Sequence, residues 1–483
     1  MPSIDFRLIA PELFLTAWAF VILFVDLFAW RGRAQKPGLP WLAASGFVVT
    51  AVLVGVVGQG ETFGKTLQVD SFAFMFQMIC VGAAVFTVML SSGMWSEGTG
   101  HKGEYYALLA FSVVGMMFLV AADDILTLYV ALELTTIPLF VLVAYAKRDR
   151  RSIEAGIKYL VIGAFSSALL LFGLALLYGL TGETGLPEIK RHLVTTFFRS
   201  GAVGVTLPLA LLFVVAGLGF KLAVVPFHAW APDVYEGAPT AVVAFLSVAS
   251  KAAGMAAFTR IFYRSFTMST GDWLGPVIVL AVLAMVLGNT VALVQHNIKR
   301  LLAYSSIAQI GYVLVGFCAM SELGAASVGM YLLVYLFANM GAFGVAIAVY
   351  NKIGSYEIAD YASLSRRSPQ LAAIMSLCLL SLTGIPPLAG FFGKYYLFLA
   401  AVEQRLYWLV IVALLTSVVS LYYYAGVMRV MYFDASKNEA PGLSIPLGTK
   451  AALWLAAAGV VLVGLFPSYF LGWAEAAARV FKF

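Results

Sequence analysis

The stretch GLGFKLAVVPFHAW (217–230) places a charged residue, Lys221, inside an apolar run and follows it with a proline. The stretch SLTGIPPLAGFFGKYYLF (381–398) repeats the combination, with two adjacent prolines before Lys394. Proline interrupts a helix because it lacks a backbone hydrogen-bond donor. A broken helix is tolerated inside a membrane where neighbouring protein or water satisfies the freed backbone groups. We therefore predict two transmembrane helices interrupted in mid-membrane, each with a lysine close to the break.

The composition of the 483-residue chain is that of a membrane protein. Hydrophobic residues make up 62% of it and charged residues 11%, whereas about 25% of a soluble globular protein is charged. This balance excludes a soluble enzyme, a secreted disulfide scaffold, a disordered chain and a nucleic-acid-binding module. The three cysteines lie in separate apolar runs, and neither a CxxC pair nor a glycine-rich phosphate-binding loop occurs. The sequence therefore predicts no metal, iron–sulfur or nucleotide site in this chain.

Fourteen apolar segments approach or exceed the length of about 20 residues that a bilayer crossing needs. We predict an all-α polytopic membrane protein with about 14 transmembrane helices, folded as a single membrane domain over 1–483. The predicted spans run roughly over 8–29, 40–58, 72–93, 104–121, 125–146, 158–180, 204–227, 238–261, 273–294, 300–319, 325–350, 369–400, 406–431 and 450–472. The interrupted spans are the seventh and the twelfth.

Two consecutive blocks of five spans, 104–261 and 273–431, are nearly equal in length, and each has its interrupted, lysine-bearing span fourth. Because five is odd, the second block must be inverted in the membrane relative to the first. Inverted repeats with broken helices are typical of transporters, whose working site lies near the bilayer midplane. We predict repeat one over helices 4–8 and repeat two over helices 9–13. The first three helices then lie within 1–93, and helix 14 covers 450–472.

Basic residues in the loops predict the orientation of the chain. If the N-terminus lies outside, 17 of the 30 Lys and Arg residues fall on the inner side and 10 on the outer side. The run KRDRR (147–151) decides most of the excess on the inner side, while Arg260 and Arg264 count as outer charges. Cytoplasmic loops carry an excess of Lys and Arg. We therefore predict a bacterial-type inner membrane protein with both termini on the periplasmic side.

Four charged residues lie well inside predicted spans: Glu133, Lys221, Lys251 and Lys394. Each costs about 2.5–3.5 kcal/mol on insertion scales, so such residues usually mark a functional path. A buried lysine takes up or releases a proton as a carboxylate approaches or withdraws, whereas arginine would hold its proton. Three lysines and one glutamate cannot all form fixed pairs, which favours a proton relay over structural ion pairs. His228 is an additional relay candidate because histidine titrates near neutral pH, and a capping hydrogen bond is its alternative role.

Three motifs resemble a known family: FHAWAPDVYEGAPTAVVAFLSVASKAAG (227–254), LLAYSSIAQIGY (301–312) and SLTGIPPLAGFFGKYYLF (381–398). They are similar to the antiporter-like membrane subunits of the proton-pumping NADH–quinone oxidoreductase, respiratory complex I. The resemblance covers essentially the whole chain. Two further segments, PDVYEGAPT (232–240) and the N-terminal PELFLTAWAFVILFVDLF (11–28), resemble the subunit N branch of this family most closely.

The resemblance implies fourteen helices, an inverted five-helix repeat and breaks in helices 7 and 12. It implies that Glu133 pairs with Lys221, that Lys251 is the connecting lysine, and that Lys394 is the terminal proton carrier. It also implies that FMN, the iron–sulfur clusters and the NADH and quinone chemistry belong to partner subunits, membrane and peripheral, with no cofactor in this chain. Two alternatives stay open: a subunit of a multisubunit cation/proton antiporter, and a scaffold subunit whose buried charges only fix assembly.

Overall fold

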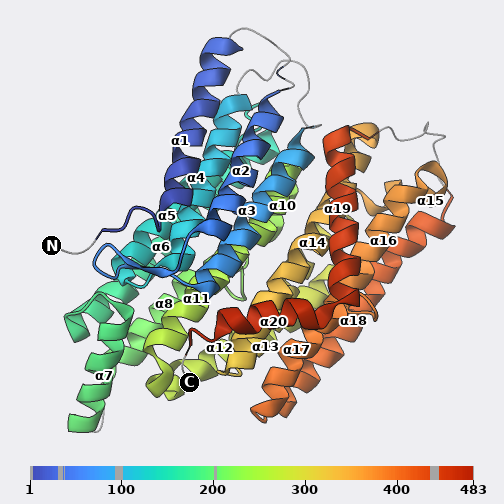
Figure 1. Ribbon diagram of the computed structural model, residues 1–483. Coiled ribbons are helices and arrows are strands. Elements are labelled where there is room, and N and C mark those ends of the chain that lie inside the picture. Colours follow the sequence, from blue (N-terminus) through green and yellow to red (C-terminus); the bar gives the residue numbers. More distant parts are fainter. Residues whose placement is uncertain are drawn as a thin grey trace.

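Helices form nearly all of the secondary structure (Figure 1). The computed structural model describes residues 4–30, 36, 38–92, 102–200, 204–435 and 445–481. Some loop residues counted for the orientation, among them Arg31, Arg33, Lys437 and Lys482, lie outside these ranges. The only strands among the described residues, β1 (Gly60–Thr62) and β2 (Leu67–Val69), pair as an antiparallel hairpin.

The first half of the chain contains helices α1 to α11. They are α1 (Ala10–Phe24), α2 (Leu39–Val56), α3 (Ser71–Ser91), α4 (Lys102–Ala121), α5 (Ile125–Val143), α6 (Arg150–Thr181), α7 (Leu186–Ser200), α8 (Thr206–Leu222), α9 (Trp230–Gly237), α10 (Thr240–Phe245) and α11 (Lys251–Ser265). Two π-helical turns, η1 (Val25–Ala29) and η2 (Leu246–Ser250), continue α1 and join α10 to α11.

The second half of the chain contains helices α12 to α20. They are α12 (Thr270–Ala292), α13 (Ile298–Phe317), α14 (Glu322–Ile353), α15 (Leu364–Arg367), α16 (Pro369–Thr383), α17 (Ala389–Glu403), α18 (Tyr407–Phe433), α19 (Leu447–Leu465) and α20 (Pro467–Ala478). Two short 3-10 turns, η3 (Thr267–Ser269) and η4 (Ile358–Tyr361), precede α12 and α15.

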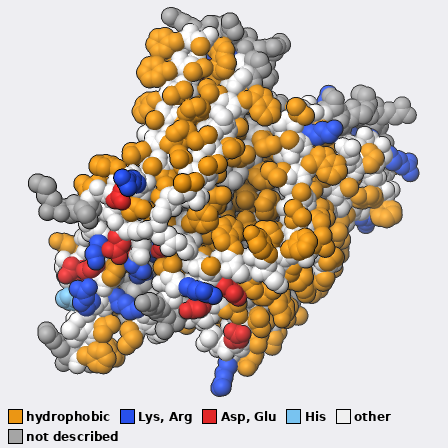
Figure 2. Space-filling view, viewed as in Figure 1, with side chains coloured by type: hydrophobic (Ala, Val, Ile, Leu, Met, Phe, Trp, Pro, Cys, Tyr) orange, Lys and Arg blue, Asp and Glu red, His pale blue; other side chains and the backbone are white. Residues whose placement is uncertain are grey.

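The predicted class, an all-helical membrane protein, is confirmed. Twelve helices in the described part of the chain are long and apolar enough to cross a membrane, and α8 and α16 are shorter apolar helices. Figure 2 shows hydrophobic side chains over most of one face of the molecule, with charged side chains gathered at its lower left and upper right. A lipid environment explains this distribution because a water-facing surface of this extent would be polar.

Both predicted interruptions are present. Helix α8 ends after Lys221, and the chain resumes as α9 eight residues later, with Trp230 Nε1 donating across the break to the Phe220 carbonyl at 3.0 Å. Helix α16 ends at Thr383 and α17 begins at Ala389. The freed Thr383 carbonyl accepts a hydrogen bond from Lys394 Nζ at 3.0 Å. At each break a side chain therefore binds a backbone carbonyl at the end of the first helical segment, as a polar group in the membrane interior requires.

Matching contacts occur in the two predicted repeats. Helices α6 and α14 each have 32 residues and end at a glycine in the left-handed conformation. After α6, the Thr184 carbonyl accepts a hydrogen bond from Ile125 N at the start of α5, at 2.9 Å. After α14, the Tyr356 carbonyl accepts one from Ile298 N at the start of α13, also at 2.9 Å. These contacts agree with the pairing of helices 4–8 with 9–13, and the block boundaries stay predictions.

The helices α7 and α20 and the β1–β2 hairpin were not predicted. A search for apolar runs of membrane length passes over such elements because they are too short to cross a bilayer. Helix α7 mixes charged and aromatic residues in LPEIKRHLVTTFFRS, and α20 has only 12 residues. Figure 1 shows α20 running across the ends of other helices rather than along them.

Arg260 is not an outer loop charge, so that part of the orientation count is wrong. It lies inside α11 with an exposed fraction of 0%. Its guanidinium donates to both carboxylate oxygens of Asp70, each at 2.9 Å. Arg264, one turn further on, pairs with Asp123 at 2.8 Å. Burial raises the pKa of Asp123, and Arg264 acts in the opposite direction. The partners lie in distant parts of the sequence, which is why a local charge count missed these pairs.

Gly390 allows α17 to approach the end of α16, and its replacement by alanine is expected to disturb this contact. A Cβ at Gly390 would lie 1.6 Å from the Ser381 carbonyl oxygen, so the backbone would have to move. Overpacking of this kind costs about 1–3 kcal/mol. We expect Gly390→Ala to lower the amount of folded protein recovered from membranes in mild detergent, measured by size-exclusion chromatography. Gly426→Ala in α18 meets no atom within 4 Å and is the matched control. Equal recovery of the two variants would contradict the close approach.

Candidate functional site

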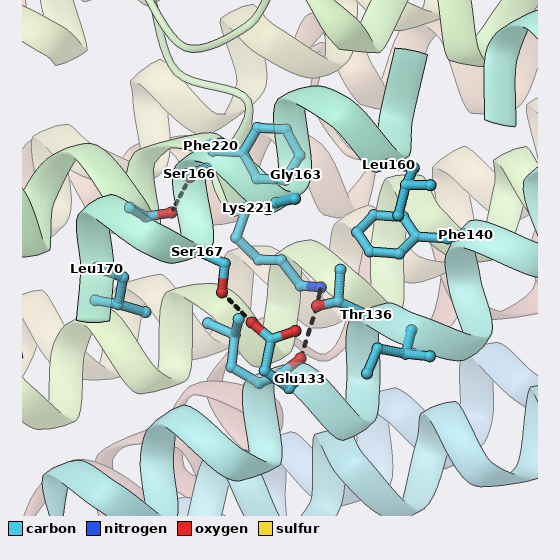
Figure 3. A pocket seen from close by; sticks show the side chains of 14 residues that line it. Glu133, Thr136, Phe140, Leu160, Gly163, Ser166, Ser167, Leu170, Phe220 and Lys221 are labelled. Atoms are coloured by element: carbon cyan, nitrogen blue, oxygen red, sulfur yellow. Dashed lines mark hydrogen bonds between the residues drawn. The ribbon is translucent and has the colours of Figure 1, made fainter. Parts of the chain in front are cut away.

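A pocket of about 270 Å³ lies between α5, α6 and α8, and its lining includes the exposed side chains of Ile137 and Leu160. Glu133 and Thr136 of α5, Ser167 of α6 and Lys221 of α8 line it. Figure 3 shows Lys221 and Ser167 pointing toward Thr136 and Glu133 across this pocket. Lys221 Nζ donates to Thr136 Oγ1 at 2.6 Å, and the Ser167 hydroxyl donates to Glu133. The structure therefore brings the predicted pair together, with each charge bonded to a neutral hydroxyl.

Lys251 is fully buried at the start of α11, directly after the π-helical turn η2. Its Nζ donates to the Ser306 carbonyl at 3.2 Å and also to the Ser306 hydroxyl. The Tyr235 hydroxyl of α9 lies 3.5 Å from the same Ser306 hydroxyl. A π-helical turn inside a helix is frequent at functional sites. Here it immediately precedes the buried lysine.

Lys394 lies in α17, the helix that follows the second break directly, and its exposed fraction is 4%. Its Nζ donates to the Thr383 carbonyl at 3.0 Å and to Ser417 Oγ at 2.8 Å. The ammonium also lies 4.4 Å from the centre of the Tyr312 ring. A ring face stabilises a cation at this distance without neutralising it. The break thus supplies a carbonyl, and neighbouring helices supply a hydroxyl and a ring.

Helix α13 connects the surroundings of Lys251 and Lys394. Ser306 binds Lys251, and Tyr312, further along the same helix, lies under Lys394. Between them, Gln309 Nε2 donates to the Leu382 carbonyl at 2.9 Å and lies 3.5 Å from the Tyr424 hydroxyl. A row of polar side chains therefore follows α13 from one lysine to the other. Sequence reasoning based on buried charge missed the tyrosines because their hydroxyls are neutral.

His228 lies in the break between α8 and α9 and is half-buried. Its Nδ1 is buried without a hydrogen-bond partner among the described residues. Its backbone carbonyl accepts a hydrogen bond from Ala231 N at 2.9 Å. His228 is absent from the residues that line the Glu133–Lys221 pocket. Its place in the relay stays a prediction.

Sequence reasoning also missed Lys299. It was counted as a loop charge, but only 2% of its surface is exposed. It lies in the first turn of α13, at the edge of a predicted span, where hydropathy does not separate a buried residue from an exposed one. Across the described residues, no group of three or more His, Cys, Asp or Glu side chains is arranged to hold a metal ion.

Comparisons with known proteins agree with the geometry. Residues 122–420 match the family described as NADH:quinone oxidoreductase/Mrp antiporter, TM. The NADH-quinone oxidoreductase subunit N of Desulfovibrio desulfuricans is 42% identical over 97% of this chain and 96% of its own length. That of Moorella thermoacetica is 42% identical over 93% of this chain and 94% of its own length.

Solved structures show the same fold. A chain of respiratory complex I from Thermus thermophilus has a TM-score of 0.79 and 31% identity, covering 96% of this chain and 98% of that one. A chain of the Mrp complex from Dietzia has a TM-score of 0.82 but 20% identity, over 98% and 97% of the two chains, so it shows the fold alone. The near full-length matches to subunit N favour complex I over the antiporter alternative. The chain belongs to the antiporter-like membrane subunits of NADH-quinone oxidoreductase, complex I, and within them to subunit N.

Proposed function

We propose that this subunit translocates protons through a relay of the partly buried Glu133 and the buried Lys221, Lys251 and Lys394. Partner subunits that hold FMN and iron–sulfur clusters pass electrons from NADH to quinone. The observation that carries the proposal is that the three lysines are buried and donate to uncharged oxygens. Their exposed fractions are 2%, 0% and 4%. The hydrogen bonds found for them among the described residues all go to hydroxyl or carbonyl oxygens.

Neutral oxygen acceptors suit a lysine that changes its protonation state. An ammonium group has three N–H donors, and a neutral amine keeps two of them. Lys251 and Lys394 each donate to two oxygens, so both bonds survive the loss of the proton. Arg260 shows the contrasting arrangement, because it is locked onto the carboxylate of Asp70 by two bonds. This contrast within one chain supports a relay over a set of purely structural charges.

In the proposed relay, the position of the Glu133 carboxylate determines whether Lys221 holds or releases its proton. Glu133 shares a pocket with Lys221, but the hydrogen bond of its carboxylate is with Ser167, so Glu133 and Lys221 are not locked together as Asp70 and Arg260 are. When the carboxylate approaches, it stabilises the protonated lysine, and when it withdraws, burial favours release of the proton. A movement of the Glu133 carboxylate away from Lys221 would drive protons through Lys251 and along α13 toward Lys394.

We also propose that both termini face the periplasm across a bacterial inner membrane. The support is the charge of the loops: the KRDRR run (147–151) makes one side of the molecule strongly basic. Residues of this run share a cavity with Lys299 and with residues after α14, which the same charge count assigns to the inner side. The loops that predict the orientation therefore belong to one face.

The Glu133→Gln variant is expected to slow proton translocation by the whole complex about tenfold, equivalent to about 1.4 kcal/mol in a barrier. The amide keeps the size and the hydrogen bond to Ser167 but removes the charge that acts on Lys221. Proton uptake by proteoliposomes during NADH:quinone turnover measures the effect. Glu403→Gln, at an exposed glutamate that ends α17, is the matched control. Wild-type proton uptake by Glu133→Gln would contradict a role of the Glu133 charge in proton transfer through Lys221.

A further inference from the structure

Lys299 is a buried cation outside the four-residue relay. It lies in the first turn of α13, with an exposed fraction of 2%. Its Nζ donates to the carbonyls of Glu236 and Ala238, at 2.7 and 2.8 Å, where α9 ends. The same Nζ lies 4.6 Å from the centre of the Tyr356 ring. Lys299 is therefore held at a point where three segments of the chain meet.

The contacts of Lys299 repeat those of the relay lysines. Like Lys251 and Lys394, it donates to two neutral oxygens, so it keeps both bonds as a neutral amine. Like Lys394, it lies over a tyrosine ring. The adjacent Arg300 behaves differently and donates to the carboxylate of Glu236 at 2.8 Å. The two neighbouring cations thus differ: Arg300 forms an ion pair, whereas the hydrogen bonds of the Lys299 amine to described residues go to carbonyls.

A cavity of about 440 Å³ connects Lys299 with the surface. Lys299 and the partly exposed end of α9, Glu236 and Gly237, lie among its lining residues, and the exposed residues Asp149, Arg151 and Asn351 lie among the others. The cavity is polar and large enough for several water molecules. Water on the face that carries the KRDRR run (147–151) therefore has a route to the Lys299 amine. Besides Lys299, the titratable and charged groups that line this cavity are Asp149, Arg151, Glu236, Tyr350, Tyr356 and Glu357. Arg300 forms ion pairs with Glu236 and Asp233.

Lys299 is linked to Lys251 by two helices. Ser306, which binds Lys251, lies seven residues after Lys299 on α13. Seven residues are about two helical turns, which places both residues on one side of the helix about 10 Å apart. On α9, the Glu236 carbonyl binds Lys299 and the neighbouring Tyr235 hydroxyl reaches Ser306. A hydroxyl and a short chain of water can bridge this distance.

We propose that Lys299 is the proton-loading residue of the relay, a role that rests on the proposed proton translocation. In its neutral form, the Lys299 amine takes a proton from water in the cavity. The resulting ammonium passes a proton by way of water and hydroxyl groups to the amine of Lys251. Lys299 is then neutral again and can take up another proton. Each cycle therefore moves one proton from the cavity to Lys251 and leaves Lys299 unchanged.

The test uses two variants in the whole complex, Lys299→Arg and Lys299→Met. Arginine keeps the charge and the donors but holds its proton, whereas methionine keeps the apolar stem alone. Both are expected to assemble and to slow proton translocation about tenfold, with NADH oxidation by an artificial acceptor unchanged. Lys352→Met, at an exposed lysine of α14 on the same face, is the control. It is expected to pump at the wild-type rate.

Two results would overturn the loading role. Wild-type proton translocation by Lys299→Arg would show that only a fixed cation is needed to hold the end of α9. Loss of assembly in both variants would likewise assign Lys299 a structural task. The Glu133→Gln variant separates the two proposals. If it loses translocation while Lys299→Arg pumps normally, the relay stands and only the loading role fails; if it pumps normally, the relay itself is in question.

Discussion

Lys394→Ala is expected to slow proton translocation by the assembled complex about 100-fold, the lower end of what a positioned acid–base group contributes. Lys394 of α17 lies over Tyr312, at the far end of the polar row along α13 that begins at Lys251, so the proposed relay ends on this lysine. Its Nζ binds the Thr383 carbonyl and Ser417, and alanine provides neither the proton carrier nor these bonds. Proton uptake by proteoliposomes, normalised to NADH oxidation by an artificial acceptor, measures the loss independently of the amount of complex.

Two further variants separate proton transfer from structural support at this position. Lys394→Arg retains a cation and hydrogen-bond donors beside the break but holds its proton. It is expected to assemble better than Lys394→Ala and still to pump slowly. Lys450→Ala, at an exposed lysine in the first turn of α19, is the matched control and is expected to pump normally. Assembly and wild-type pumping by Lys394→Ala would refute the relay.

Asp70→Asn is expected to destabilise the fold by about 3 kcal/mol, because removal of one partner leaves a buried charge uncompensated. Arg260 is fully buried and donates to both carboxylate oxygens of Asp70. Asparagine keeps the cap that Asp70 provides to Ala73 N at the start of α3, so the variant isolates the ion pair. The measurement is the temperature at which the subunit is lost from the purified complex. Asp5→Asn, at an exposed residue before α1, is the control.

A double replacement tests whether the pair itself or its imbalance matters. Replacing both partners of a buried ion pair by apolar residues is often neutral, whereas removing one is costly. We therefore expect Asp70→Leu combined with Arg260→Met to be more stable than Asp70→Leu alone. If the double variant is as unstable as the single one, the cost comes from the lost cap or from packing rather than from the unpaired arginine.

Much of the fold was predictable from local sequence. Each predicted span contains a helix, and both breaks lie where a lysine and prolines interrupt an apolar run. The membrane makes this prediction strong because each backbone group within it must be satisfied locally, and a helix does so within one segment. The short amphipathic helix α7 and the C-terminal helix α20 escaped prediction because their stability depends on packing rather than on length and apolarity.

The burial of the three lysines in the candidate site was predictable from the sequence, but their contacts were not. A lysine inside an apolar run is buried wherever that run packs, so Lys221, Lys251 and Lys394 could be named from the sequence. Lys299 and Arg260 lie near the ends of spans, where the same rule gives no answer. Their burial depends on α9 and on Asp70, which other parts of the chain supply.

The sequence by itself determined that this chain is a helical membrane protein, where two helices break, and that Lys221, Lys251 and Lys394 lie inside apolar spans. These properties follow from composition and spacing within single segments. Only the tertiary structure decided which oxygens the buried lysines meet. Lys221, Lys251 and Lys394 bind Thr136, Ser306 and Ser417 at separations of 85, 55 and 23 residues. Local periodicity carries no information about such partners, because they come together only when helices from different parts of the chain pack.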